Sequence, residues 1–386
     1  MPALDGRRLW FVGIGGAGLS AYATIARAWG AEVGGWDRVR TPYLDALDGV
    51  EVELAPEPVV RDGWEVVVSS AYPGVAGTSR AAFLAELTSL RRSIVVAGSH
   101  GKGTTAAMIA FALRETGNDP AWLIGAPVPQ LGANAGAGEG WLVVEGDESD
   151  RTVFGLPAEI AVITNVELDH HTEFRSLAEL EAEFEAWAER AAHVVRDAPP
   201  FEGALALPGD HNRLNAGNAL AALELAGVAR KAAAAAVARF EGTGRRFEVS
   251  EAGGVTVVDD YAHHPSEIEA TIAAARERFP GSRVRALFQP HLYSRTLHLA
   301  RELGAALAGA DDIVVTDVYP AREQPIPGVS GKLVVDALAD LGRVPAWMPS
   351  VESAVDYLSE RTRPGDVVLV LGAGDVDRAA ALLRER

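Results

Sequence analysis

The sequence contains no cysteine. This absence excludes disulfides, thiolate metal sites and a cysteine nucleophile, and it agrees with a reducing compartment. Any metal ion must therefore be bound by oxygen and imidazole ligands.

Basic residues are few relative to acidic ones, because 35 Lys and Arg face 53 Asp and Glu, a formal net charge of −18. No basic stripe suits a phosphate backbone, so we expect no nucleic-acid partner. The one long uncharged run, Leu9–Ala26, is interrupted by four glycines. A strand, a glycine turn and a helix explain this run without a membrane, and we expect a cytoplasmic protein with no membrane partner.

Short apolar runs bounded by glycine or proline alternate with Ala/Leu/Glu-rich stretches of helical period. This alternation is typical of βαβ units, and it predicts an α/β fold with parallel sheets. Helices are expected near 105–116, 177–191 and 216–239. Strands are expected at 9–13, 65–69, 93–97, 141–145, 160–164, 255–259, 283–288, 312–316 and 366–371.

A length of 386 residues suggests two or three domains. Three glycine-rich turns, at 13–18, 98–104 and 372–374, favour three modules in series. We expect domains 1–91, 92–240 and 241–386. The second boundary falls after the Ala-rich helix, where Gly242 and Gly244 break the pattern.

The first motif is a G-x-G-x-x-G turn after a predicted strand, formed by Gly13, Ile14, Gly15, Gly16, Ala17 and Gly18. Asp37 follows a second strand some two dozen residues later. Such a turn lets the backbone approach a pyrophosphate at a helix N-terminus. The motif predicts a diphosphate ligand without specifying the nucleotide, and the alternative is a tight turn that binds nothing.

The second motif lies between the strand 93–97 and a helix, and it comprises Gly98, Ser99, His100, Gly101, Lys102, Gly103, Thr104 and Thr105. It departs from the standard phosphate-loop pattern, because Val96 and Gly103 stand where that pattern has glycine and Ser or Thr. The order of strand, glycine turn, lysine, hydroxyls and helix is nevertheless kept. We expect the loop amides and Lys102 to bind phosphates, and Thr104 or Thr105 to offer a hydroxyl to Mg²⁺.

The third motif is acidic, since Glu145–Asp150 follows one strand and Asn165–His171 follows the next. We expect these adjacent strand ends to present Glu145 and His170 to one point. A carboxylate and a neutral imidazole near a bound triphosphate form a reasonable Mg²⁺ site. Solvated loop acids are the alternative for either segment alone.

Together the motifs resemble those of the Mur ligases, over nearly the whole chain. The resemblance rests on eight ordered segments: Gly98–Lys102, Glu145–Asp150, Asn165–His170, Gly209–Asn212 with Asn215, Gly242–Phe247, Asp259–Pro265, Phe288–His291 with Arg295, and Glu323 with Pro325–Gly328. It is strongest to the members that join L-alanine to UDP-N-acetylmuramate.

The resemblance implies a UDP-binding N-terminal domain, a central ATPase domain and a C-terminal Rossmann-like domain for the amino acid. It also implies a reaction in which the lactyl carboxylate takes the γ-phosphoryl group of ATP. L-alanine then attacks the acyl phosphate, and phosphate leaves from a tetrahedral intermediate. ATP and Mg²⁺ are the expected cofactors, and the protein is expected to be a monomer or homodimer.

The resemblance also implies residue roles. His211 and Asn215 would contact adenine, Arg245 or Arg246 the ATP phosphates, and Asp259 would lie near the nucleotide. Tyr261, His263 and Arg295 would hold L-alanine, the arginine through its carboxylate. The turn 13–18 would bind the UDP diphosphate, with Asp37, Ser69 and Ser70 close to the same ligand. Lys102, Glu145, His170, His263 and Arg295 would be the catalytic set.

Three departures from the Mur pattern concern this chain. Gly103 stands where the family usually has a Mg²⁺-binding Thr, and Thr104 is the expected substitute, as in folylpolyglutamate synthases. Leu292 stands where many relatives have Arg, which leaves Arg295 as the arginine of the alanine motif. The chain is also short for the family, mainly between His171 and Gly209, where little besides the helix 177–191 is expected, and after Ser70.

Three other functions stay open at this point. The turn 13–18 and Asp37 alone fit an NAD-dependent oxidoreductase, which would leave the other motifs unexplained. A ligase of the same fold could use another acid or amine, as in murein peptide recycling or folate metabolism. A non-catalytic binder of UDP-sugar or ATP is the third alternative.

Overall fold

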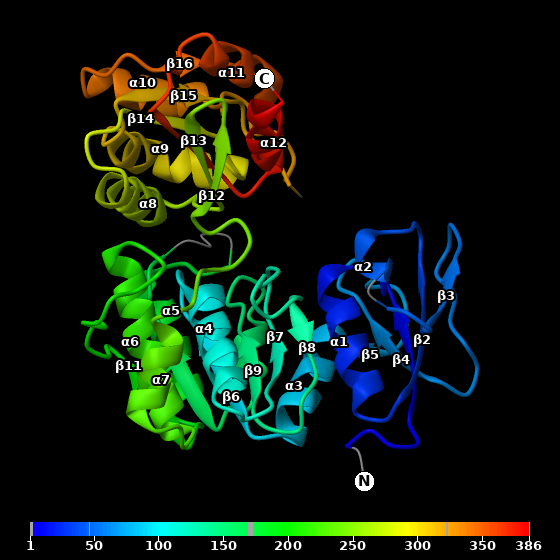
Figure 1. Ribbon diagram of the computed structural model, residues 1–386. Helices are drawn as coiled ribbons and strands as arrows, with labels where there is room; N and C mark the ends of the chain where they lie inside the picture. The colour runs from blue at the N-terminus through cyan, green and yellow to red at the C-terminus, as the bar shows by residue number, and fades with distance from the viewer. Residues whose placement is uncertain (1–2, 46, 169–172, 322, 386) are drawn as a thin grey trace. The chain divides into compact units, whose positions relative to one another are not determined.

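The computed structural model describes residues 3–45, 47–168, 173–321 and 323–385. The chain forms two compact units (Figure 1). The first comprises Met1–Val166, Leu180–Gly203 and Asn215–Phe240, and the second comprises Glu167–Glu179, Ala204–Leu214 and Glu241–Arg386. The first unit holds two sheets and the second holds one, so the α/β fold class is confirmed. The domain boundaries after residues 91 and 240 stay predictions.

The first sheet has the strand order β3-β2-β1-β4-β5, and all its strands are parallel. Its elements are β1 (Arg8–Val12), α1 (Ala17–Ala28), β2 (Glu32–Asp37), α2 (Pro42–Asp45), β3 (Glu51–Leu54), β4 (Glu65–Val68), β5 (Thr78–Ser79) and α3 (Arg80–Leu90). Because β1 pairs with both β2 and β4, the order reverses there. The turn after β1 therefore opens at the switch point where ligands of such sheets bind.

The second sheet has the order β11-β10-β6-β9-β7-β8, with only β8 antiparallel among the described strands. Its strands are β6 (Ser93–Ala97), β7 (Ala121–Leu123), β8 (Ala135–Gly136), β9 (Leu142–Glu145), β10 (Ile160–Ile163) and β11 (His193–Arg196). The helices of this part are α4 (Lys102–Glu115), η1 (Thr152–Gly155), α5 (Leu177–Ala188), α6 (Asp210–Leu225) and α7 (Arg230–Val237).

The third sheet has the order β12-β13-β17-β14-β15-β16, and only β12 is antiparallel among the described strands. Its strands are β12 (Glu248–Ala252), β13 (Val255–Asp260), β14 (Val284–Phe288), β15 (Asp312–Val315), β16 (Ala346–Trp347) and β17 (Val367–Leu371). Its helices are α8 (Pro265–Arg278), α9 (Tyr293–Leu307), α10 (Lys332–Asp340), α11 (Val351–Ser359), η2 (Asp375–Asp377) and α12 (Arg378–Arg384).

Alternation along the strands of the third sheet explains its two covered faces. Val257, Leu287 and Val368 point to one side and form a core with α11 and α12. Helices α8 and α10 contact strands of the same sheet and pack against α9 (Figure 1). Both faces are therefore buried, which is why these strands read as continuous apolar runs.

All nine predicted strands are confirmed to within one residue at each end. The single helix expected over 216–239 is wrong. The structure has α6 and α7, separated at Gly227, whose φ of +92° ends the first helix. The segment between 189 and 209 also contains a strand, β11, that was not expected. Among the described residues, no helix combines the length and apolarity that a membrane crossing requires.

Candidate active site

The glycine turn after β1 is closed by Asp37. Its Oδ2 accepts the N–H of Gly15 at 2.7 Å, and its Oδ1 accepts the N–H of Arg38 at 2.7 Å. Gly13 has a φ of +88°, and a Cβ there would lie 2.9 Å from the Cβ of Ser69. The structure therefore brings the predicted Gly13, Gly15, Asp37 and Ser69 together. It leaves Ser70 exposed beside them.

The phosphate-type loop follows β6, which lies between β9 and β10 in the sheet. Val96 pairs with Glu145 on one side and with Val162 on the other. The expectation that the ends of β9 and β10 are adjacent is therefore wrong. The loop lies between those two ends, so each flanks it from its own side.

Two glycines of this loop are required by close contacts. Gly98 has a φ of +127°, and a Cβ there would lie 2.3 Å from Thr164 Oγ1. Gly101 has a φ of +76°, and a Cβ there would lie 2.3 Å from Asn215 Oδ1. Between them, the N–H of His100 donates to Asn165 Oδ1 at 2.8 Å. The loop is thus hydrogen-bonded to Asn165, just after β10, and packs closely against Asn215 of α6.

Lys102 begins α4 and forms a buried ion pair. Its Nζ lies 3.0 Å from Glu148 Oε2 and donates to the carbonyl of Ser99 at 3.1 Å. The side chain of Glu148 is only 1% exposed. Burial opposes the charge of Lys102, but Glu148, Asp147 and Glu145 raise the pKa of its ammonium above the usual value. The lysine is therefore charged where phosphates are expected.

Glu145 ends β9 and faces the first turn of α4. Its Oε2 accepts the N–H of Gly125 at 2.6 Å, and a Cβ at Gly103 would lie 3.1 Å from the same oxygen. A side chain at position 103 would therefore point toward the carboxylate of Glu145. Thr104 is buried and lies one residue further along, about 100° around the helix.

The remaining members of the predicted metal set differ in what the structure describes. Thr105 is fully buried, and its hydroxyl has no partner among the described residues. His170 lies outside the described residues. The carboxylates of Glu145, Asp147 and Glu148 all raise the pKa of Lys102. Oxygen donors of this kind fit Mg²⁺.

His211 and Asn215, both predicted to contact adenine, lie one turn apart on α6. Burial, and then Arg246, lower the pKa of His211 to about 4. The imidazole is therefore neutral at pH 7, which suits a contact with an uncharged base better than a contact with phosphate.

Arg245 and Arg246 lie shortly before β12, in a segment where Arg245 and Phe247 have positive φ. Arg245 has a φ of +55°; its Nε lies 3.2 Å from Asp259 Oδ2 and its Nη2 donates to the Gly372 carbonyl at 2.8 Å. Burial raises the pKa of Asp259, and Arg245 opposes that shift. Both guanidinium groups lie over the ring of Tyr261, at 5.4 and 5.2 Å. These predicted residues therefore form one group.

The predicted amino-acid residues are linked through His291. The rings of Tyr261 and His263 are 5.3 Å apart, and those of His263 and His291 are 5.8 Å apart. Arg295 is 4% exposed, and its Nη1 lies 3.1 Å from His291 Nδ1. All these residues lie at the carboxyl ends of β13 and β14, or on α9 directly after them.

Sequence reasoning did not identify Tyr319, whose ring stacks on that of His291 at 5.8 Å. Its backbone N–H donates to Pro290 and its carbonyl accepts from Leu292, at 2.8 and 2.9 Å. Leu292 has a φ of +70°, which is strained for a leucine. The position of Tyr319 just after β15 is the one sequence signal that could have pointed to it.

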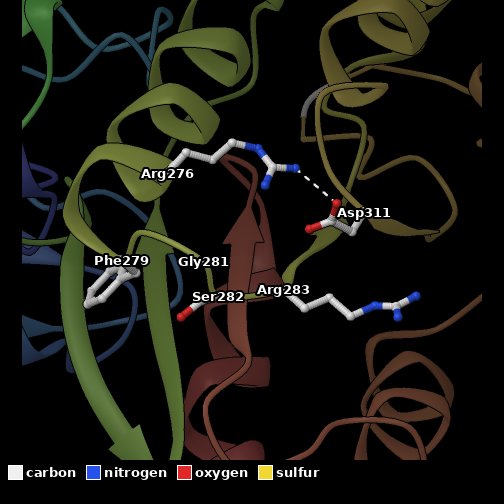
Figure 2. A pocket seen from close by; sticks show the side chains of 6 residues that line it. All are labelled: Arg276, Phe279, Gly281, Ser282, Arg283 and Asp311. Carbon is white, nitrogen blue, oxygen red and sulfur yellow. Dashed lines mark hydrogen bonds and ion pairs between the residues drawn. The ribbon is translucent and has the colours of Figure 1, made fainter.

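A surface cavity of about 610 Å³ lies elsewhere in the third sheet's part of the chain, and Figure 2 shows its lining side chains. Ser282 and Arg283 precede β14 and Asp311 precedes β15, so the cavity is at the amino ends of these strands. Its arginines already pair with carboxylates: Arg276 with Asp311 at 3.2 Å and Arg283 with Asp312 at 2.7 Å. The predicted ligand residues lie at the opposite strand ends.

Comparison with known proteins identifies the family. Residues 245–374 match the family model described as Mur ligase, glutamate ligase domain. The UDP-N-acetylmuramate–L-alanine ligase of Streptomyces coelicolor is 37% identical, with 95% of this chain and 94% of the relative aligned. The chain belongs to the Mur ligase family. The corresponding ligase of Rubrobacter xylanophilus is 38% identical, with 98% of this Mur ligase and 100% of the relative aligned.

Solved structures agree with this assignment. The crystal structure of the UDP-N-acetylmuramate-alanine ligase from Thermotoga maritima matches this Mur ligase with a TM-score of 0.78 and 25% identity, and 98% of each chain is covered. A murein peptide ligase from Psychrobacter arcticus shares the fold, with a TM-score of 0.65 at 23% identity. The alignment with the Streptomyces relative spans 436 positions, whereas this Mur ligase has 386 residues, so the relative has positions that are missing here.

Proposed function

We propose that this Mur ligase joins L-alanine to the lactyl carboxylate of UDP-N-acetylmuramate, with ATP converted to ADP and phosphate, in the synthesis of peptidoglycan precursors. The observation that carries the proposal is a charged loop lysine, Lys102, with Glu145 on the flanking strand, in a chain aligned over almost its full length with L-alanine ligases. Because the reaction consumes ATP, we expect it to take place in the cytoplasm.

The first step is phosphoryl transfer, which requires positioning and charge neutralisation more than covalent help. A lactyl carboxylate oxygen attacks the γ-phosphorus, the bond to the β–γ bridging oxygen breaks, and ADP leaves. The amides in the first turn of α4, which have no partner within the helix, and the ammonium of Lys102 neutralise the phosphates. We assign the UDP diphosphate to the turn 13–18, beside Ser69 and Ser70.

Glu145, Thr104 and His170 would hold Mg²⁺, which supplies charge neutralisation at the transferring phosphoryl group when it is bound. Glu145 suits this role because Gly125 donates to its Oε2, while a carboxylate has a second oxygen and further lone pairs to offer to a cation. Thr104 lies beside the position that faces Glu145, in the first turn of α4.

The other ATP contacts follow from the chemistry of their side chains. We assign adenine to the neutral His211 and to Asn215, one turn further along α6. We assign the phosphates to Arg245 and Arg246, with Asp259 near the nucleotide. Loop residues Gly98, Ser99, His100, Gly101, Gly103 and Thr105 complete this assignment.

The second step is attack of the L-alanine amine on the acyl phosphate carbonyl, after which phosphate leaves and the amine loses its proton. Arg295 pairs with the carboxylate of L-alanine, and Tyr261 and His263 enclose the amino acid. The Nδ1 of His263 lies 2.9 Å from the carbonyl of Tyr261. A carbonyl only accepts, so Nδ1 carries the hydrogen and the Nε2 of the neutral ring carries the lone pair. His263 is thereby set up to take a proton.

Phosphate release tests the proposal directly. The assay contains the protein, ATP, Mg²⁺ and UDP-N-acetylmuramate, with L-alanine, glycine or L-serine as the amine. We expect rapid release with L-alanine and slower release with the other two. Tight nucleotide binding without release from any amine would contradict the proposal and favour a non-catalytic binder. Release only with another acid or amine would favour a different ligase of the same fold.

A further inference from the structure

Arg80 lies between two of the loops described above, although neither loop contains it. It is the first residue of α3, where Ser79 caps the helix by accepting the N–H of Ala82 at 3.2 Å. A Cβ at Gly18, in the first turn of α1, would lie 3.9 Å from Arg80 Cδ. On its other side, Arg80 Nη2 lies 3.6 Å from Oδ2 of Asp150, at the end of the acidic motif.

The guanidinium group interacts with Tyr22 of α1 and with the carboxylates of the acidic loop. Tyr22, which is 5% exposed and one turn after Gly18 on α1, interacts electrostatically with Arg80. Burial opposes the charge of Arg80, but Tyr22, Asp150 and Asp147 raise the pKa of its guanidinium above the usual value. Asp147 also raises the pKa of Lys102. The carboxylate of Asp147 therefore favours the charged form of both Arg80 and Lys102.

The contacts of Arg80 leave it able to bind a further anion. A guanidinium has five N–H donors, and the Nε of Arg80 is buried with no partner among the described residues. The ion pair with Asp150, at 3.6 Å, is longer than a hydrogen bond. Gly18, which lies beside Arg80, belongs to the first turn of α1, where the helix dipole is positive and the amides have no partner within the helix.

Arg91, at the other end of α3, provides a comparison. Its Nε is also buried without a partner in the described part of the chain. Its Nη2, however, donates to Glu139 Oε2 at 2.7 Å, and its guanidinium lies over the ring of Trp29 at 5.1 Å. Arg91 thus joins α3 to the segment after β8 by direct contacts, far along the helix from the glycine turn.

We propose that Arg80 is a further substrate-binding residue, whose guanidinium donates hydrogen bonds to an anionic group of the UDP-linked substrate bound at the turn 13–18. This inference rests on the proposed function, since it takes the UDP-sugar as the ligand of that turn. The anionic group is either the diphosphate or the lactyl carboxylate, because both present oxygens that a guanidinium recognises. A purely structural Arg80 would only fasten the acidic loop to α3.

Isothermal titration calorimetry tests the proposal with three probes. UDP and UDP-N-acetylglucosamine carry the diphosphate alone, and UDP-N-acetylmuramate carries the carboxylate as well. We expect Arg80→Gln to weaken binding by about tenfold or more, the effect of losing a charge-assisted hydrogen bond. Weaker binding of all three probes would assign Arg80 to the diphosphate. Weaker binding of UDP-N-acetylmuramate alone would assign it to the carboxylate.

Two further variants keep the test decisive. Arg91→Gln is the matched control on the same helix and should bind all three probes as the unmodified protein does. Arg80→Lys keeps the positive charge beside Asp150, so it should fold and show a smaller loss. Unchanged affinity of a folded Arg80→Gln protein for all three probes would overturn the proposal and leave the proposed function standing. Failure of the unmodified protein to bind any probe would overturn both.

Discussion

Lys102 and Glu148 form an ion pair of 3.0 Å in which the carboxylate side chain is 1% exposed. This pair has a consequence for stability as well as for catalysis. When one partner of a buried pair is removed, the other is left as an uncompensated buried charge.

Replacing Lys102 by Ala should therefore abolish turnover and also lower the free energy of unfolding by about 3 kcal/mol. Urea unfolding of Lys102→Ala, Glu148→Ala and the double variant measures the second effect. The double variant should be less destabilised than the sum of the two single variants, because it leaves no unpaired charge. Additive losses would show that the pair does not couple.

Gly103 provides a test specific to this chain. Threonine is the residue expected there from the family, yet a Cβ at position 103 would lie 3.1 Å from Glu145 Oε2. Gly103→Thr should therefore displace Glu145 from Gly125 and raise the Mg²⁺ concentration for half-maximal activity, by about tenfold for a cost near 1.4 kcal/mol.

The control for Gly103→Thr is Gly155→Thr, since a Cβ at Gly155 meets nothing within 4 Å. It should leave the Mg²⁺ dependence unchanged. A lower Mg²⁺ requirement in Gly103→Thr would contradict this prediction. It would show that Glu145 moves aside at little cost and that the threonine hydroxyl strengthens Mg²⁺ binding.

Thr104 is the residue assigned to supply that hydroxyl. Thr104→Val keeps the shape of the side chain and removes the oxygen, so it should raise the Mg²⁺ requirement by about tenfold. Thr116→Val makes the same change at the other end of α4, where the hydroxyl donates to the carbonyls of Ala112 and Leu113 and accepts from Asn118 Nδ2, and it should not alter the Mg²⁺ titration. Equal Mg²⁺ curves for both variants would remove Thr104 from the metal set.

Arg295 should control the affinity for L-alanine. Arg295→Lys keeps the charge but loses the bidentate geometry, so the KM for L-alanine should rise by about 10- to 100-fold. The KM values for ATP and UDP-N-acetylmuramate should change little in steady-state kinetics. A uniform rise in all three would indicate that Arg295 supports the fold around His291 rather than the amino acid.

The pH dependence of stability should report on His211, whose pKa burial lowers to about 4. In the unfolded chain His211 binds a proton near pH 6.5, whereas in the folded protein it does so only near pH 4. The free energy of unfolding therefore decreases as the pH falls below about 6.5. Between about pH 7.5 and pH 5 the loss should be about 2 kcal/mol. The free energy of unfolding of the protein and of His211→Gln, whose side chain does not titrate, is measured by denaturant unfolding at several pH values. The protein should lose about 2 kcal/mol more than the variant between about pH 7.5 and pH 5. The same pH dependence in both proteins would contradict a buried neutral imidazole.

The sequence was sufficient for the nine predicted strands because each is a short, largely buried apolar run with a polar or glycine residue after it. It was insufficient for α6 and α7, since the alanine-rich composition hides the break at Gly227. Strand β11 was missed because three of its four residues are exposed, so no apolar run marks it.

The candidate site shows the same limit. Motifs identified Lys102, Glu145, His211 and Arg295, because their residue types and order carry chemistry. The partners that hold them come from distant parts of the chain and leave no local pattern. Gly125 on Glu145 and Tyr319 on His291 are two examples.

The most direct test of the central claim follows the carboxylate oxygen of the substrate. UDP-N-acetylmuramate labelled with ¹⁸O in its lactyl carboxylate is incubated with the protein, ATP, Mg²⁺ and L-alanine, and the products are analysed by mass spectrometry. An acyl phosphate route predicts UDP-N-acetylmuramoyl-L-alanine together with phosphate that carries ¹⁸O from the substrate. Absence of the amide product, or release of unlabelled phosphate only, would contradict it.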